Sequence, residues 1–406
     1  MNTTYWLTNT RLETSYYKEN DMITATNTEF FHLLIEDGKI TDIVPASEQL
    51  TDELPKKDAK QLLALPSFVE KHCHLDKTLL GDQWRAVKPV KNILERVVIE
   101  KTTLPTLKTT TQERAENLLG RFVKYGVTHV RTHADIYPEV GLENLEEIKK
   151  AFQTFSGKIE PEIVGFAQHG FLKANTRELI QESTKHGVDY IGSVDPATVD
   201  NDIETSLQVL VDIAVEGNVG IDLHIHDPNE LGAFTIKRLA ELTIEAGLQG
   251  KVAVSHAFGI GDISRTALDE MIPLLKEAGM TFISSVPIDR KFPPLEYLRE
   301  QGINTAVCCD NIFDSWSPFN NGDILERLER LAQLKQWKDE YSLSQSIYFI
   351  TGGITPLNQL GEQVWPKVGD AANIVLVDAT CTAETVARRA ERKATIYKGN
   401  FSFDNI

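Results

Sequence analysis

Residues able to bind one catalytic metal ion occur at four positions along the 406-residue chain. They are the His72-Cys73-His74 motif, His224, His256 and Asp310, and each follows an apolar, strand-like run. These runs are Leu63–Val69, Gly220–Leu223, Lys251–Ser255 and Ile303–Cys309. Imidazole nitrogens and a carboxylate oxygen are ligands suited to zinc or another first-row divalent ion. The order His-x-His, His, His, Asp therefore indicates a hydrolase that activates water on a divalent cation.

The His-x-His motif alone is weak evidence, because two ordinary histidines at the start of a loop have the same spacing. His72 and His74 are two residues apart at a strand end, so both imidazoles are expected on the same side. Cys73 is then expected to point into the core, and Cys308 and Cys309 are interpreted as small buried residues beside the site. Only the combination with the other three positions predicts a metal site.

Glycines separate helix-like from strand-like segments at intervals close to 30 residues. They are Gly126, Gly157, Gly187, Gly217, Gly247, Gly279 and Gly302. Glycine after a helix accepts the left-handed conformation that ends it, and a parallel strand can follow a short loop later. Seven such units and the strand that ends at His72 make eight strands. This pattern predicts an α/β fold, a (β/α)₈ TIM-type barrel with its chemistry at the carboxyl ends of the strands. An open doubly wound sheet and an α-solenoid are the less favoured alternatives.

Both termini differ from this pattern. Phe30–Ile35 and Lys39–Val44 flank Asp37-Gly38, which predicts a hairpin with a two-residue turn. Near the other end, Ala372–Val377 and Ala394–Tyr397 are strand-like. We therefore expect a small β-sandwich domain built from residues 1–62 and 361–406, with the barrel at residues 63–360.

The composition favours a protein that acts on a small molecule. With 42 basic and 59 acidic residues, the net charge is −17, which argues against binding to nucleic acid or to an anionic membrane. No apolar run approaches the roughly 18 residues of a membrane span. The four cysteines have no CxxC spacing, which fits a reducing cytoplasm. A cytoplasmic protein is expected, as a homo-oligomer.

Longer motifs resemble the cytosine deaminase group of the amidohydrolase superfamily over nearly the whole chain. They are Leu65–Lys77, His129–Asp135, Phe166–Gly170 and Asp310–Trp316. Three further motifs are most similar to the s-triazine hydrolases of that group. They are Gly192–Thr198, Asp222–Asp227 and Asn320–Asp323.

The resemblance implies a role for each candidate residue. It implies that His72, His74, His224 and Asp310 ligate one divalent ion, zinc or iron, with manganese as an alternative. It implies that His256 orients or deprotonates the nucleophilic water, that Gln168 hydrogen-bonds the substrate ring, and that Trp316 helps to wall the pocket. The alternatives are purely structural roles: Gln168 as an amide that caps a loop, and Trp316 as a core-packing residue.

The chain departs from the cytosine deaminases at one position. Those enzymes place a glutamate three residues after the strand-five histidine, where it moves a proton to the ring, whereas this chain has Asp227. The shorter carboxylate argues against cytosine as the substrate. His226 is the alternative proton carrier. A second ion is not expected, because strand four, Tyr190–Ser193, is followed by no bridging lysine.

The predicted activity is hydrolysis of an exocyclic amino or alkylamino C–N bond on a nitrogen heterocycle such as a pyrimidine or triazine. A small heterocyclic molecule is thus the expected partner. Two alternatives remain open: a cyclic amidase that opens a ring, as in dihydroorotase-like enzymes, and a non-catalytic metal-binding protein. A missing ligand would favour the last, and none is missing from the sequence.

Overall fold

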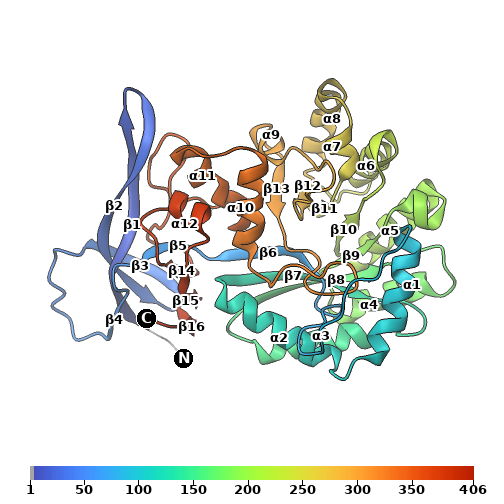
Figure 1. Cartoon of the computed structure of the whole chain (residues 1–406), viewed down its shortest axis with the longest axis horizontal. Helices are drawn as coiled ribbons and strands as arrows, with labels where there is room; N and C mark the ends of the chain where they lie inside the picture. The colour runs from blue at the N-terminus through green and yellow to red at the C-terminus, as the bar shows by residue number, and fades with distance from the viewer. Residues whose placement is uncertain (1–3) are drawn as a thin grey trace.

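Eight parallel strands form a barrel in the computed structural model, which describes residues 4–406 (Figure 1). In chain order they are β6 (Phe68–Cys73), β7 (Val127–Asp135), β8 (Glu160–Ala167), β9 (Tyr190–Ser193), β10 (Gly220–His224), β11 (Val252–Ser255), β12 (Thr281–Ser284) and β13 (Asn304–Val307). Each pairs with the next. The ends meet because Cys73 forms a bridge with Asp310, whose backbone N–H donates to the His72 carbonyl at 2.8 Å. The predicted (β/α)₈ barrel is confirmed.

Helices surround the strands and share one large apolar core with them (Figure 1). Those before β10 are α1 (Ile93–Thr103), α2 (Thr111–Lys124), α3 (Glu143–Thr154), α4 (Thr176–Ser183) and α5 (Ile203–Gly217). Those after it are α6 (Asn229–Glu245), α7 (Phe258–Asp262), α8 (Arg265–Glu277), α9 (Leu295–Glu300), α10 (Ile324–Leu334), α11 (Glu340–Ser346) and α12 (Thr382–Arg388). Among residues 4–406, no helix combines the length and apolar character needed to cross a membrane.

The glycines near the helix ends act largely as the sequence predicts. Six of the seven have a positive φ, and Gly217 is the exception. There α5 continues through Gly217, and Asn218 takes the left-handed conformation instead, at φ 50°. Asparagine reaches this region more easily than most residues, since its short polar side chain can hydrogen-bond locally. At the start of α2, Thr110 and Glu113 form a capping box.

The two terminal segments meet in one mixed sheet beside the barrel. Its order is β16 (Asn400–Asp404), β15 (Arg392–Tyr397), β14 (Ile374–Val377), β5 (Leu63–Pro66), β1 (Tyr5–Glu19), β2 (Met22–Glu36) and β3 (Lys39–Pro45), with β4 (Lys56–Asp58) on β1. The Ile40 N–H donates to the Asp370 carbonyl at 2.9 Å, so the β3 end of the sheet contacts the segment that precedes β14. Leu33 and Ile396, from opposite halves, belong to one apolar core. The expected small β unit built from both ends of the chain is therefore present.

Two details of the terminal sheet differ from the sequence interpretation. The run Leu63–Val69 is not one strand: β5 pairs with β14 in the terminal sheet, and β6 begins the barrel at Phe68. Apolar residues are buried in both sheets, so the pattern shows no break between them. The hairpin of β1 and β2 was not predicted. It turns at Asn20 and Asp21, both with positive φ.

Candidate metal centre and active site

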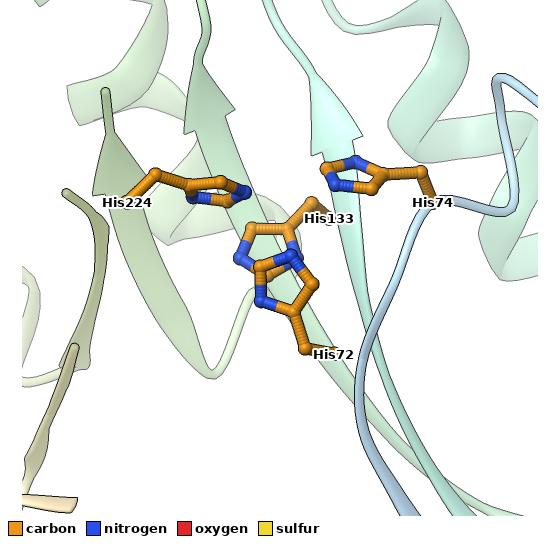
Figure 2. A group of neighbouring side chains, drawn as sticks. All are labelled: His72, His74, His133 and His224. Atoms are coloured by element: carbon orange, nitrogen blue, oxygen red, sulfur yellow. The ribbon is translucent and has the colours of Figure 1, made fainter. Parts of the chain in front are cut away.

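Four buried histidines gather at the carboxyl ends of three barrel strands. His72 lies in β6, His74 just after it, His133 in β7 and His224 at the end of β10. One ring nitrogen from each lies within 4.8 Å of one from every other. Figure 2 shows the four rings converging on one region. The folding of the barrel thus brings together residues that are up to 152 positions apart in the sequence.

Asp310, in the segment that follows β13, lies against two of the same histidines. Its Oδ1 lies 3.5 Å from Nε2 of His72 and 3.5 Å from Nε2 of His74. His72, His256 and Asp310 form a second group whose ligand atoms lie within 4.8 Å of one another. The structure therefore brings together all four sequence-predicted ligands, with His256 beside them.

The backbone is left-handed at two of these positions. His256, directly after β11, has φ 68°. Asp310, shortly after the end of β13, has φ 58°. Residues other than glycine rarely adopt such angles, and histidine and aspartate are among those that do so more often. Local backbone strain of this kind concentrates at functional sites.

A hydrogen-bond chain fixes which nitrogen of His72 is available to a metal. The Ser255 hydroxyl donates to Asp222 Oδ1 at 2.7 Å and lies 2.7 Å from His72 Nδ1. Because this hydroxyl has only one proton, it must accept from His72 Nδ1–H. The proton on Nδ1 leaves the lone pair on Nε2, the atom that faces Asp310. Arg131 holds the other Asp222 oxygen at 3.0 Å, so the chain continues across the barrel.

Replacement of Ser255 by alanine is expected to weaken metal binding about 10- to 100-fold, the usual effect of removing a residue that orients a ligating histidine. The affinity can be measured by competition with a chromophoric chelator. Ser264→Ala, at the exposed N-cap of α8, is the matched control and should leave the affinity unchanged. An unaltered affinity in Ser255→Ala would exclude this role.

The donor set fits a divalent cation. Burial holds the pKa values of His74, His224 and His256 well below the ordinary histidine value and lowers that of His133 to about 4. Neutral imidazoles are the form that binds metal. Burial would raise the pKa of Asp310, but His256, His72 and His74 hold it well below its usual range.

Several of these buried nitrogens have no hydrogen-bond partner among residues 4–406. They include Nε2 of His72, Nδ1 of His74 and both ring nitrogens of His224. Unpaired polar atoms in a protein interior are costly and therefore uncommon. A bound cation would satisfy this set of nitrogens, which supports the assignment of the centre to a metal ion.

His133 is a member of the cluster that sequence reasoning missed. Its ring lies 4.2 Å from that of His72, between centroids, and both its nitrogens are buried without a hydrogen-bond partner. The available signal was alternation: Arg131, His133 and Asp135 lie two residues apart on β7 and so share its inner face. Because His133 lies on this inner face near the carboxyl end of β7, it could have been named as a candidate for the same site.

His226 and Asp227 follow β10 and share one carboxylate partner. Asp195 Oδ2 lies 2.9 Å from His226 Nδ1, and its Oδ1 accepts the backbone N–H groups of both residues. The His226 ring stacks on His256, with 4.3 Å between centroids. Burial opposes a charged His226, but Asp195 raises its pKa above the ordinary value. Burial and Asp195 also raise the pKa of Asp227, whose Oδ1 accepts from Thr198.

Gln168 belongs to a buried polar network around Lys77. The Lys77 ammonium donates to Gln168 Oε1 and lies 3.4 Å from an oxygen of Glu100 and 3.4 Å from one of Asp135. Gln168 Nε2 donates to Glu100 at 2.7 Å, and Trp316 Nε1 donates to the second Glu100 oxygen. Both ends of the Gln168 amide thus already have protein partners. Its contact with a substrate stays a prediction.

A cavity of about 600 Å³ opens beside the centre. Its lining includes His226, His256, Asp310 and Trp316, whereas Gln168 lines a neighbouring cavity of about 330 Å³. A volume of this size suits a small organic ligand. Three of the residues expected to carry the chemistry, and the tryptophan expected to wall the pocket, therefore face one shared space.

Comparison with known proteins assigns the chain to a family. The model of the amidohydrolase family matches residues 95–403. The chain belongs to the amidohydrolase family. This amidohydrolase is 32% identical to the N-isopropylammelide isopropyl amidohydrolase of Pseudomonas sp. strain ADP, over 84% of its own length and 86% of that protein. It is 36% identical to the uncharacterized protein YahJ of Escherichia coli K12, over 99% and 88% of the two chains.

Solved structures agree with this assignment. The amidohydrolase superposes on N-isopropylammelide isopropylaminohydrolase from Burkholderia multivorans with a TM-score of 0.86 and 26% identity, covering 99% of both chains. The 5-methylcytosine deaminase of Klebsiella pneumoniae gives 0.81 and 26%, covering 99% of this chain and 98% of that one. The resemblance to the cytosine deaminase group is confirmed, and the protein is a hydrolase of C–N bonds in a metal-dependent family.

Proposed function

We propose that this chain removes an exocyclic amino or alkylamino group from a nitrogen heterocycle such as a pyrimidine or triazine. The observation that carries the proposal is the convergence of His72, His74, His224 and Asp310 beside the 600 Å³ cavity. Two relatives support the substrate class, since their names give N-isopropylammelide and 5-methylcytosine as the molecules they act on.

In this proposal, the three histidines and Asp310 hold one divalent ion, zinc or iron. When bound, such an ion would lower the pKa of a coordinated water towards neutrality. The proposal of one ion is supported by the sequence after β9, where Val194-Asp195-Pro196 offers no lysine to bridge a second.

His256 and Asp310 are proposed to accept the proton of the attacking water. Both line the cavity, and a ligand atom of one lies within 4.8 Å of a ligand atom of the other. Because their pKa values are held low, the imidazole is neutral and the carboxylate is ionised at neutral pH. Each can therefore act as a proton acceptor.

The geometry favours His226 over Asp227 as the donor of a proton to the leaving amine. His226 lines the cavity, stacks on His256 and has its charged form supported by Asp195. Asp227 is 5% exposed, with one oxygen held by Thr198. This assignment differs from the expectation based on the resemblance, in which the strand-five acid carried the proton.

His226→Gln is expected to lower kcat about 100-fold or more with the metal content unchanged, since proton transfer by a placed side chain contributes about 10²–10⁴-fold. Asp227→Asn is the matched comparison, because it replaces the adjacent acid by its isosteric amide, and it should lose less than about 10-fold. Steady-state kinetics with elemental analysis tests both variants. A larger loss of kcat in Asp227→Asn than in His226→Gln would instead identify Asp227 as the proton donor.

Amine release from a panel of aminated pyrimidines, triazines and pterins tests the proposed reaction. The expected result is release of ammonia or an alkylamine from at least one ring, with the ring still closed on mass spectrometry. A ring-opened product would instead identify a cyclic amidase. A metal-loaded protein that acts on none of these rings would contradict the proposal.

A further inference from the structure

The 600 Å³ cavity is lined by an excess of cationic side chains. They are Lys91, Arg96, Arg290, Arg327 and Arg330, against only Asp289 and Asp310 among the acids. The chain as a whole has a net charge of −17. The cavity therefore has a charge opposite to that of the molecule that contains it, and arginine is the side chain best suited to bind oxyanions.

Arg96 is a buried guanidinium without a partner. It lies on α1, is 8% exposed and forms no ion pair or side-chain hydrogen bond within residues 4–406. Its Nη1 is buried and unsatisfied. A buried charge without a counter-charge is strongly unfavourable. An anionic group in the cavity would satisfy this side chain.

Arg327, on α10, is a second buried guanidinium with donors to spare. It is 6% exposed, and its Nη2 donates to the Cys309 carbonyl at 3.3 Å. Its Nε is 3.8 Å from a Glu326 oxygen, too far for a hydrogen bond, and is buried without one. The other Glu326 oxygen is held by Arg330. One carboxylate thus faces two guanidiniums, and a positive charge remains.

We propose that Arg96 and Arg327 form an oxyanion subsite and that the substrate is an aminated heterocycle with a carboxylate or phosphate substituent. This inference rests on the proposed function and adds the chemical class of the substrate. Because Asp310, His226 and His256 line the same cavity, one ligand can place its ring at the centre and its anionic group at the arginines. Guanidinium pairs with such groups through two parallel hydrogen bonds.

Binding of non-reactive probes tests the subsite separately from turnover. Pyrimidine-5-carboxylate has no amino group to release, and pyrimidine is its neutral match. Calorimetry on the metal-loaded protein measures the dissociation constant of each probe. The carboxylate is expected to bind about 10- to 100-fold more tightly than pyrimidine, because only the carboxylate can accept charge-assisted hydrogen bonds from a buried guanidinium. Equal affinity for the two probes would overturn the inference.

Variants complete the test. Arg96→Gln and Arg327→Gln should each weaken binding of pyrimidine-5-carboxylate at least about 10-fold, with little change for pyrimidine. Binding of cytidine 5′-monophosphate, compared with that of cytidine, tests the phosphate source in the same way. Arg388→Gln, whose side chain is 77% exposed on α12, is the control and should leave both values unchanged. If a buried variant fails to fold, Arg290→Gln, at an exposed position of the same cavity, can be used instead to test whether the cationic lining binds the anion.

The outcomes separate the subsite from the reaction. Arginine-dependent binding of pyrimidine-5-carboxylate without amine release from any ring would support the subsite and contradict the proposed function. Efficient amine release from neutral rings that Arg96→Gln and Arg327→Gln leave unchanged would support the function and overturn the subsite.

Discussion

Asp310→Asn is expected to lower turnover about 10³-fold or more while the protein keeps most of its metal. In the proposed site, three histidines would still hold the ion, whereas the amide could no longer accept a proton from the attacking water. The substitution is also expected to leave the folded structure unchanged. Residue 310 has φ 58°, a conformation that asparagine adopts as readily as aspartate. Stopped assays of amine release and elemental analysis of the same samples measure the two effects.

Two comparisons make the Asp310 result interpretable. Asp314→Asn removes a nearby carboxylate that caps the backbone N–H groups of Trp316 and Ser317, and it controls for a general loss of loop structure. Asp310→Ala combines loss of the carboxylate with an unfavourable backbone angle and should lower thermal stability as well. Near-normal turnover in metal-loaded Asp310→Asn would remove Asp310 from the proposed mechanism.

Removal of the metal by a chelator is expected to abolish turnover completely, and one equivalent of zinc or iron per chain should restore it. In the proposed mechanism, His256 and Asp310 accept a proton efficiently only from a water whose pKa the metal has lowered. The melting temperature should also fall on removal, because an ion that binds only the folded state stabilises it. Elemental analysis, calorimetric titration and thermal unfolding measure these effects.

The number of equivalents is the critical value in the titration. Full activity at one equivalent, with no further gain at two, is the expected result. A requirement for two tightly held ions would contradict the single-ion proposal, in which case His133, with its two unpaired nitrogens, is the first residue to replace. Activity in protein stripped of metal would contradict the metal-dependent mechanism as a whole.

The sequence predicted the fold well because its signals are local. Glycine after a helix has a conformational cause that acts within a few residues, and this sufficed to place eight strands in order. At Gly217 the adjacent Asn218 took the same role without changing the strand that followed. The run Leu63–Val69 failed as a prediction because its division depends on β14, which lies more than 300 residues away.

For the site, the sequence predicted residue types better than partners. The ends of β6, β10 and β13 supply His72, His224 and Asp310 to one region, as expected for parallel strands that share an edge. Ser255 and the amide partners of Gln168 could not be anticipated, because each contact joins different strands or loops at distances that spacing does not encode. His133 could have been predicted, because the alternation of residues along β7 places it on the inner face of the strand.

The junction between β6 and β13 has a consequence for how the protein matures. His72 and His74 are made early, yet Asp310 follows more than 230 residues later, and its N–H bonds to the His72 carbonyl only when the barrel is shut. Chains fold as they emerge from the ribosome, amino end first. The proposed ligand set is therefore complete only after β13 has been made and its end has closed against β6.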